Sequence, residues 1–225
     1  MTTHQPRPAE EAARAAQVAR IIDELAHDYD DRFDRASVEA VYRDSLDRLT
    51  QTARVQGFLP VLAGRFAAQR LDVRARTEGK RPHRAPTVLF VCVENAGRSQ
   101  MAAALLRHYA GPAIHIHTGG SAPAGSVHPE VVHAMKEVGL SLEEEFPKPL
   151  TDDVVAAADV VVLLGCGDAC PVLPGRRYED WPVADPAHAT PEQVAAIRAD
   201  LDTRVRDLVA GLLPDLPLPA PVTAP

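Results

Sequence analysis

Apolar side chains recur with two different periods along this chain. Up to residue 75 they return every three or four positions, which is the spacing of one face of an α-helix. Three segments show this pattern: residues 10–29, 37–53 and 58–75. Ser37 is the expected N-cap of the second segment, and Pro60 suits the first turn of the third. The pattern predicts a small three-helix bundle over residues 1–80, which a basic linker of residues 81–86 joins to the rest of the chain.

Beyond the linker, compact apolar runs alternate with helical patterns. The apolar runs are residues 87–91, 113–117 and 159–165, and the helical patterns are residues 99–110, 129–140, 151–158 and 190–213. Thr151 is a candidate N-cap for the third of these helices. Such alternation predicts an α/β domain over residues 87–213, in which helices cover both faces of a parallel sheet. Residues 214–225 form a proline-rich tail that we expect to be disordered.

Two cysteines lie at the ends of expected strands. Cys92 directly follows the run 87–91, and Cys166 directly follows the run 159–165. Ligands of such sheets bind beyond the carboxyl ends of the parallel strands. We therefore expect Cys92 and Cys166 to face the same edge of the sheet.

The loop after Cys92 has the composition of an oxyanion site. Its backbone N–H groups and the positive end of the next helix point at one centre, and Arg98 can hold two oxygens with its planar guanidinium. This positive field favours Cys92 as a nucleophilic thiolate, which the Ser99 hydroxyl is placed to hydrogen-bond. Asn95 tolerates a left-handed backbone, and Gly97 is free of side-chain clashes. The expected anion-binding residues are Val93, Glu94, Asn95, Ala96, Gly97 and Arg98. A buried packing cysteine followed by a surface arginine is the other interpretation, and the strand–loop–helix position favours the nucleophile.

Three other residues, Asp185, Cys166 and Cys170, could take part in chemistry at this oxyanion site. Asp185 belongs to an Asp-Pro pair before the last helix, where it could protonate a leaving oxygen or simply start a turn. Cys166 and Cys170 could be a redox pair working with Cys92, part of a zinc site, or inert thiols. No second pair with zinc-ligand spacing accompanies them, so we expect no metal. The chain has 3 cysteines, too few for a disulfide scaffold, which favours the redox interpretation.

The net charge of −7 is unevenly divided, because residues 1–86 carry +2 and residues 87–225 carry −9. A chain without a basic stripe is not expected to bind nucleic acid. No apolar stretch approaches the ~20 residues that span a bilayer, and the N-terminal residues lack the apolar core of a secretory signal. We therefore expect no membrane association and a cytoplasmic location. The helical bundle is expected to serve dimerisation, giving a homodimer, or docking, or only to stabilise the chain.

The segment VLFVCVENAGRSQMA, residues 88–102, resembles the active-site loop of low-molecular-weight tyrosine phosphatases and of phosphatase-like arsenate reductases. The resemblance extends over residues 87–213 and implies a sheet of four parallel strands. Phosphatases of this family typically have Ser-Pro after the loop arginine, whereas Ser99-Gln100-Met101 is similar to the reductases. Cys166 and Cys170 stand where thioredoxin-coupled reductases carry their resolving pair. The N-terminal helices resemble an extension of some actinobacterial-type members.

Two positions depart from the family loop, which often reads C-x-G-N-x-C-R-S. Gly97 replaces the second cysteine, which removes a competing disulfide partner for Cys92. Glu94 replaces the glycine and places an acid beside an anion site, which is unfavourable unless its side chain turns outward.

The resemblance implies reduction of arsenate to arsenite by a relay of Cys92, Cys166 and Cys170, with Asp185 as the acid. It implies no bound cofactor, because a thioredoxin would supply the electrons. The alternatives are a phosphomonoesterase that uses the same loop, a reductase that uses mycothiol in place of the cysteine pair, and a non-enzymatic oxyanion sensor.

Overall fold

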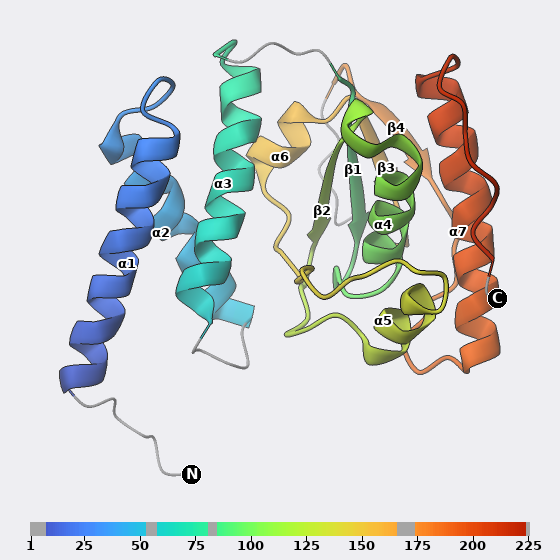
Figure 1. Cartoon of the computed structure of the whole chain (residues 1–225), viewed down its shortest axis with the longest axis horizontal. Coiled ribbons are helices and arrows are strands. Elements are labelled where there is room, and N and C mark those ends of the chain that lie inside the picture. Colours follow the sequence, from blue (N-terminus) through green and yellow to red (C-terminus); the bar gives the residue numbers. More distant parts are fainter. Residues whose placement is uncertain (1–7, 53–57, 81–84, 166–173, 224–225) are drawn as a thin grey trace. The chain divides into compact units, whose positions relative to one another are not determined.

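The computed structural model describes residues 8–52, 58–80, 85–165 and 174–223. The chain divides into two compact units, Met1–Arg81 and Pro82–Pro225 (Figure 1). Within the described residues, no helix combines the length and the apolar character needed to cross a membrane.

The first unit is a bundle of three helices, as the apolar spacing predicts (Figure 1). The helices are α1 (Pro8–Asp28), α2 (Arg35–Thr52) and α3 (Leu59–Thr77). Their core is made of apolar side chains that recur at helical spacing: Ile22, Leu25, Tyr29, Val38, Val41, Tyr42, Leu49, Phe66 and Leu71. The Tyr42 hydroxyl donates a hydrogen bond of 3.2 Å to the Pro60 carbonyl, which ties α2 to the first turn of α3.

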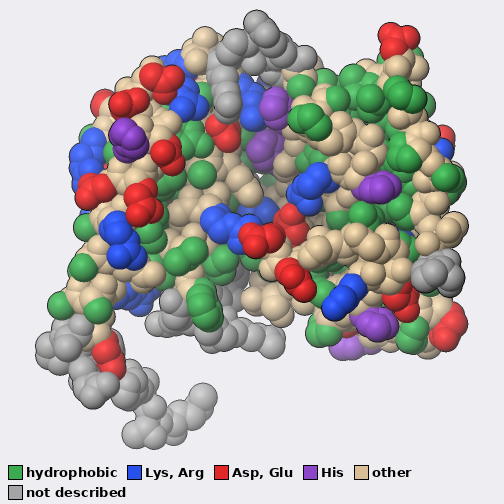
Figure 2. Space-filling model, in the orientation of Figure 1, with side chains coloured by type: hydrophobic (Ala, Val, Ile, Leu, Met, Phe, Trp, Pro, Cys, Tyr) green, Lys and Arg blue, Asp and Glu red, His purple; other side chains and the backbone are tan. Residues whose placement is uncertain are grey.

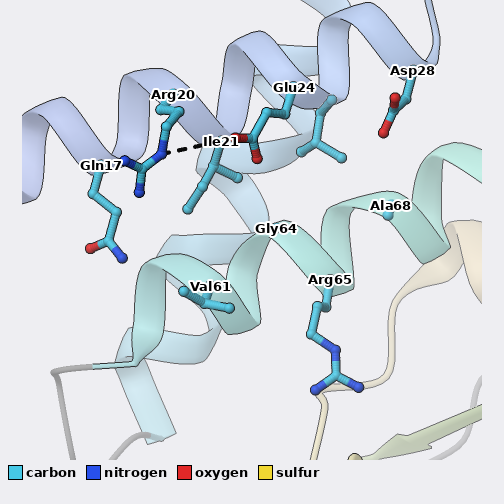
Figure 3. A pocket seen from close by; sticks show the side chains of 10 residues that line it. Gln17, Arg20, Ile21, Glu24, Asp28, Val61, Gly64, Arg65 and Ala68 are labelled. Carbon is cyan, nitrogen blue, oxygen red and sulfur yellow. Dashed lines mark ion pairs between the residues drawn. The ribbon is translucent and has the colours of Figure 1, made fainter.

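A groove of about 390 Å³ runs between α1 and α3 (Figure 3). The two helices approach closely at Gly64, where an added Cβ would lie 2.8 Å from Cγ2 of Ile21. Arg20 and Glu24 form an exposed ion pair along its rim, with 3.9 Å between Nε and Oε1. On the face that Figure 2 shows, basic and acidic side chains of this unit are interspersed and form no basic stripe.

The second unit is built on four parallel strands in the order β2-β1-β3-β4. The strands are β1 (Thr87–Cys92), β2 (His115–Gly120), β3 (Val160–Leu163) and β4 (Arg177–Asp180). Three helices pack on one face: α4 (Arg98–Ala110), α5 (Pro129–Lys136) and α7 (Pro191–Leu212). The short helix α6 (Asp152–Ala157) lies on the other face (Figure 1). The predicted four-stranded sheet with helices on both faces is therefore confirmed.

β1 is the centre of this unit because it pairs with β2 on one side and β3 on the other. All six of its residues are buried, as expected for an apolar run covered on both faces. Val88, Phe90 and Cys92 face the layer of α4 and α7, and the Phe90 ring lies 5.9 Å from that of Trp181 between centroids. The buried strand fixes the position of Cys92 at its carboxyl end.

The first residues of the helices match the N-caps predicted from the sequence only in part. Ser37 is not the N-cap of α2, because its N–H donates a 2.7 Å hydrogen bond to Oδ1 of Asp34, the residue before the helix. This hydrogen bond holds the pKa of the Asp34 carboxyl below its usual value. Thr151 occupies the N-cap position of α6, but its side chain makes no capping hydrogen bond. Thr190 caps α7 through reciprocal hydrogen bonds with Gln193.

The tail is not disordered over residues 214–223. The Arg206 guanidinium donates a 2.6 Å hydrogen bond to the Pro219 carbonyl, and the Val222 N–H donates one of 3.1 Å to the Tyr109 hydroxyl oxygen. Leu216, Leu218 and Val222 are partly buried against the core. Leucines alternate with prolines here, so the extended tail buries apolar side chains that composition alone does not predict.

Candidate active site

The Cys92 thiol lies beneath the loop that follows β1, and the residue is only 2% exposed. Its Sγ lies 3.0 Å from Oγ of Ser99 and accepts a 3.2 Å hydrogen bond from the Asn95 N–H. The Asn95 amide nitrogen in turn donates to Oγ of Ser99 at 2.8 Å, which directs the hydroxyl proton of Ser99 toward the sulfur. Two donors therefore converge on Sγ, the arrangement that a thiolate nucleophile requires.

The backbone carbonyl groups of the loop accept hydrogen bonds from the segment that follows β2. The oxygens of Val93, Glu94 and Ala96 accept hydrogen bonds of 2.9, 2.9 and 3.0 Å from the N–H groups of Ala122, Ala124 and His128. Carbonyls engaged in this way leave the interior of the loop to N–H groups, as an anion cradle requires. This geometry supports the predicted anion-binding role of residues 93–98.

Asn95 holds the loop in a conformation that few residues adopt, with a φ of 50°. Its Oδ1 accepts hydrogen bonds of 2.9 Å from the Lys148 N–H and 3.2 Å from the Gln100 amide. The same Gln100 amide donates to the carbonyls of Asn95 and Phe146, at 2.9 and 3.3 Å. Gln100 therefore shapes the loop, a role that the sequence comparison of Ser-Gln-Met with Ser-Pro does not reveal.

Arg98 begins α4 and is paired with the expected acid. Its Nη2 lies 2.7 Å from Oδ2 of Asp185, and its Nη1 donates a 3.4 Å hydrogen bond to the Val183 carbonyl. The Arg98 side chain is 10% exposed and that of Asp185 is 54% exposed. The structure thus brings Cys92, Arg98, Ser99 and Asp185 together, and an entering oxyanion must compete with Asp185 for the guanidinium.

Gly97 is required by close packing. A Cβ added there would lie 2.7 Å from Cγ of Pro186 and 3.4 Å from Cδ2 of His128. The family's second cysteine could not occupy this position unless the Asp185-Pro186 loop moved. The departure at Gly97 is therefore coupled to the position of that loop.

The chain returns to the site after β3, at Gly165. Its φ is +71°, and an added Cβ would lie 2.5 Å from Nη1 of Arg98. The backbone at Gly165 therefore lies directly against the guanidinium. Cys166 and Cys170, the expected resolving pair, lie outside the described residues, and their role stays a prediction. In the described part of the chain, no group of three or more His, Cys, Asp or Glu residues could hold a metal ion.

Residues 87–216 match the family model of the low-molecular-weight phosphotyrosine protein phosphatases, which is more than half of the chain. The chain belongs to this family. Residues 18–75 match a second model, described as the N-terminal domain of protein-tyrosine-phosphatase-like proteins. The family that the loop resembles, and the presence of an N-terminal extension, are therefore confirmed.

Among solved structures of this family, the thioredoxin-dependent arsenate reductase of Corynebacterium glutamicum is 41% identical, with a TM-score of 0.78. The alignment covers 87% of this chain and 96% of that protein, so it extends from the second unit into the N-terminal helices. Arsenate reductase 1 of Staphylococcus epidermidis is 32% identical over 123 residues, which are 53% of this chain and 92% of that protein. The arsenate reductase of Bacillus subtilis is 37% identical over 106 residues, 45% of this chain and 75% of that protein.

Proposed function

We propose that the protein reduces arsenate to arsenite and takes its electrons from thioredoxin. The observation that carries this proposal is the 41% identity to a thioredoxin-dependent arsenate reductase, which extends over 87% of the chain. The buried Cys92 thiol, with two hydrogen-bond donors at Sγ and Arg98 at the mouth of the loop, supports the same chemistry.

The first step is nucleophilic attack by the Cys92 thiolate on arsenic. Arsenate enters the loop of residues 93–97 and replaces Asp185 as the ion-pair partner of Arg98, because a dianion binds the guanidinium more strongly than one carboxylate does. A bond forms between Sγ and arsenic, and one oxygen leaves as water after Asp185 supplies a proton. The adduct still contains arsenic(V), so this step involves no net electron transfer.

Reduction occurs when a second thiol attacks the first. The Cys166 thiolate attacks Sγ of Cys92, the sulfur–arsenic bond breaks, and its electron pair leaves with arsenic as arsenite. Two thiols have then lost two electrons to form a Cys92–Cys166 disulfide. Cys170 attacks Cys166, which frees Cys92 and forms a Cys166–Cys170 disulfide for thioredoxin to reduce. Gly165, which lies against Arg98, supports this relay because Cys166 is the next residue.

The alternative function, an aryl phosphatase, needs an apolar wall against which the aromatic ring of its substrate can pack. Among the described residues, the large apolar side chains that are exposed are Phe58 and Val61, both in the first unit. The described residues of the second unit therefore offer no large exposed apolar side chain that could form such a wall.

We further propose a homodimer through the N-terminal helices and a location in the cytoplasm, where thioredoxin systems keep thiols reduced. The exposed side chains of Phe58 and Val61, at 69% and 44%, support an interface on the first unit.

The decisive experiment follows NADPH consumption with arsenate, thioredoxin and thioredoxin reductase, beside a parallel assay coupled to mycothiol. We expect turnover in the thioredoxin assay and none after Cys92→Ser. The Cys170→Ser variant is expected to accumulate the Cys92–Cys166 disulfide, which mass spectrometry of unreduced peptides detects. Thioredoxin-dependent turnover of Cys166→Ala at the parent rate would contradict the relay.

A further inference from the structure

Glu94, the unusual acid in the anion loop, meets a histidine from another element. Its Oε2 lies 2.9 Å from Nε2 of His128, the residue that directly precedes α5. The His128 side chain is 21% exposed and that of Glu94 is 49% exposed, so the pair lies at the rim of the loop. Neither the spacing of the sequence nor the proposed relay gives this pair a role.

His128 contacts the anion loop through two hydrogen-bonding groups and borders it at a third position. Its backbone N–H donates a 3.0 Å hydrogen bond to the Ala96 carbonyl, and its imidazole pairs with Glu94 on the other side of Asn95. Its ring also borders Gly97, where an added Cβ would lie 3.4 Å from Cδ2. The residues that His128 holds thus flank Asn95, whose left-handed backbone gives the loop its curvature.

The charge of this pair matters because the loop is proposed to bind a dianion. A glutamate in the loop repels an oxyanion, whereas a protonated histidine beside it cancels that charge and attracts the oxyanion. Other charged or titratable groups on the neighbouring segments are Glu130 on α5, which accepts a hydrogen bond from the His188 N–H, and Asp185, which pairs with Arg98.

We propose that His128 is a positioning residue that sets the oxyanion affinity of the Cys92 loop through its charge. As an imidazolium it neutralises Glu94 and fixes the loop, and when it loses its proton the uncompensated carboxylate repels the anion. This inference rests on the proposed oxyanion site and names a control of that site. It also explains how the loop accommodates Glu94 where relatives often have glycine.

The sign of the pH dependence follows directly. The imidazolium form binds the anion more tightly, so affinity is highest at low pH and falls as pH rises through the range in which histidines titrate, about pH 5 to 8. Because a proton on His128 favours the anion, a bound anion also favours the proton on His128.

The test measures sulfate binding by isothermal titration calorimetry on full-length Cys92→Ser protein across that range. Sulfate is a tetrahedral dianion with no titration there, and the serine removes the titration of the thiol. We expect the dissociation constant to rise about fivefold from the acidic to the basic end, an effect of the size that one partly screened charge produces. Adding His128→Asn should abolish this rise and give weak binding at every pH.

Two further variants separate charge from structure. Adding Glu94→Gln to the His128→Asn protein should restore the affinity, because the repelling carboxylate is gone, although the contact between the two side chains is not rebuilt. His133→Asn is the matched control, since His133 pairs with Glu137 at 3.5 Å farther along α5 and should leave the pH dependence intact.

The same pH dependence with and without His128 would overturn the inference. A uniform loss of affinity that Glu94→Gln does not restore would also overturn it, because His128 would then act only through structure. Absence of sulfate binding at every pH would contradict the proposed oxyanion site itself. Sulfate binding without arsenate turnover in the thioredoxin assay would instead contradict the proposed reaction and leave the His128 inference standing.

Discussion

Gln100 stands outside the anion loop and yet determines the shape of that loop. Its amide reaches the carbonyls of Asn95 and Phe146 and Oδ1 of Asn95, at 2.9 to 3.3 Å, and the residue is fully buried. A buried carbonyl that loses its hydrogen-bond donor destabilises the folded protein. Removing the Gln100 side chain should therefore destabilise the anion loop.

We expect Gln100→Met, which keeps the length of the side chain, to lower the free energy of unfolding by about 1–3 kcal/mol. It should also lower kcat/KM for arsenate by about tenfold or more, because the N–H groups of the loop lose their alignment. Chemical denaturation and the thioredoxin-coupled assay measure the two effects.

Thr190→Ala is the matched control for this variant. It removes the N-cap of α7, where Oγ1 of Thr190 accepts a 3.3 Å hydrogen bond from the Gln193 N–H, and should cost about 1 kcal/mol of stability. Its kcat/KM should not change. An unchanged kcat/KM in Gln100→Met would show that the loop does not need this amide.

Single residues of the site were predictable where the chemistry is local. Cys92, Arg98 and Ser99 follow from their spacing across one strand–loop–helix junction. The contacts of Gln100 with Phe146 and of Glu94 with His128 were not, because they join residues more than thirty positions apart. Such pairs depend on how the elements pack, which a single sequence does not encode in its spacing.

At the scale of elements, the end of β3 is the second support of the site. The chain leaves this strand through Leu164 and reaches Gly165 with a φ of +71°, where it touches the Arg98 guanidinium. A side chain at this position would face both backbone strain and a collision with Nη1.

Gly165→Ala should therefore lower the sulfate affinity of the Cys92→Ser protein about tenfold or more, equivalent to about 1.4 kcal/mol. Gly139→Ala supplies the control, because Gly139 has a φ of +75° and open space around it. Both variants should lose about 1–3 kcal/mol of stability through strain, and the Gly139 variant should keep its sulfate affinity. Equal affinities in the two variants would mean that Gly165 does not position Arg98.

Most elements were predictable because they carry strong apolar patterns, and the exceptions have physical reasons. β4 is an edge strand of sequence Arg-Tyr-Glu-Asp, whose polar residues give no strand signal, so only the family resemblance implied a fourth strand. β2 begins at His115 and not at residue 113, because Gly111–Ala113 form a 3₁₀ turn. Helix α2 begins directly after Asp34 and not at Ser37, because aspartate is an equally good N-cap and comes earlier in the chain.

At the scale of the whole molecule, the two units differ in how widely relatives share them. The Staphylococcus epidermidis enzyme aligns over 92% of its length with only 53% of this chain. An arsenate reductase of this family can therefore lack a segment of the length of the first unit.

We expect a chain that begins at Pro82 to keep the arsenate turnover of the full chain, because the anion loop, Asp185 and both later cysteines belong to the second unit. Light scattering should show a dimer for the full chain and a monomer for the shortened one. The same monomeric mass for both would remove the dimer proposal, and lost turnover in a folded shortened chain would show that the first unit takes part in catalysis.

The packing of Trp181 on Phe90 has a practical consequence for spectroscopy. Trp181 is the only tryptophan in the chain, it is 5% exposed, and it lies two residues before Val183, whose carbonyl accepts a hydrogen bond from Arg98. We expect an oxyanion that draws the guanidinium away from the Val183 carbonyl to change the surroundings of this indole. Fluorescence excited selectively at tryptophan should therefore follow ligand binding and unfolding of the second unit without a label, because the first unit contains tyrosines but no tryptophan.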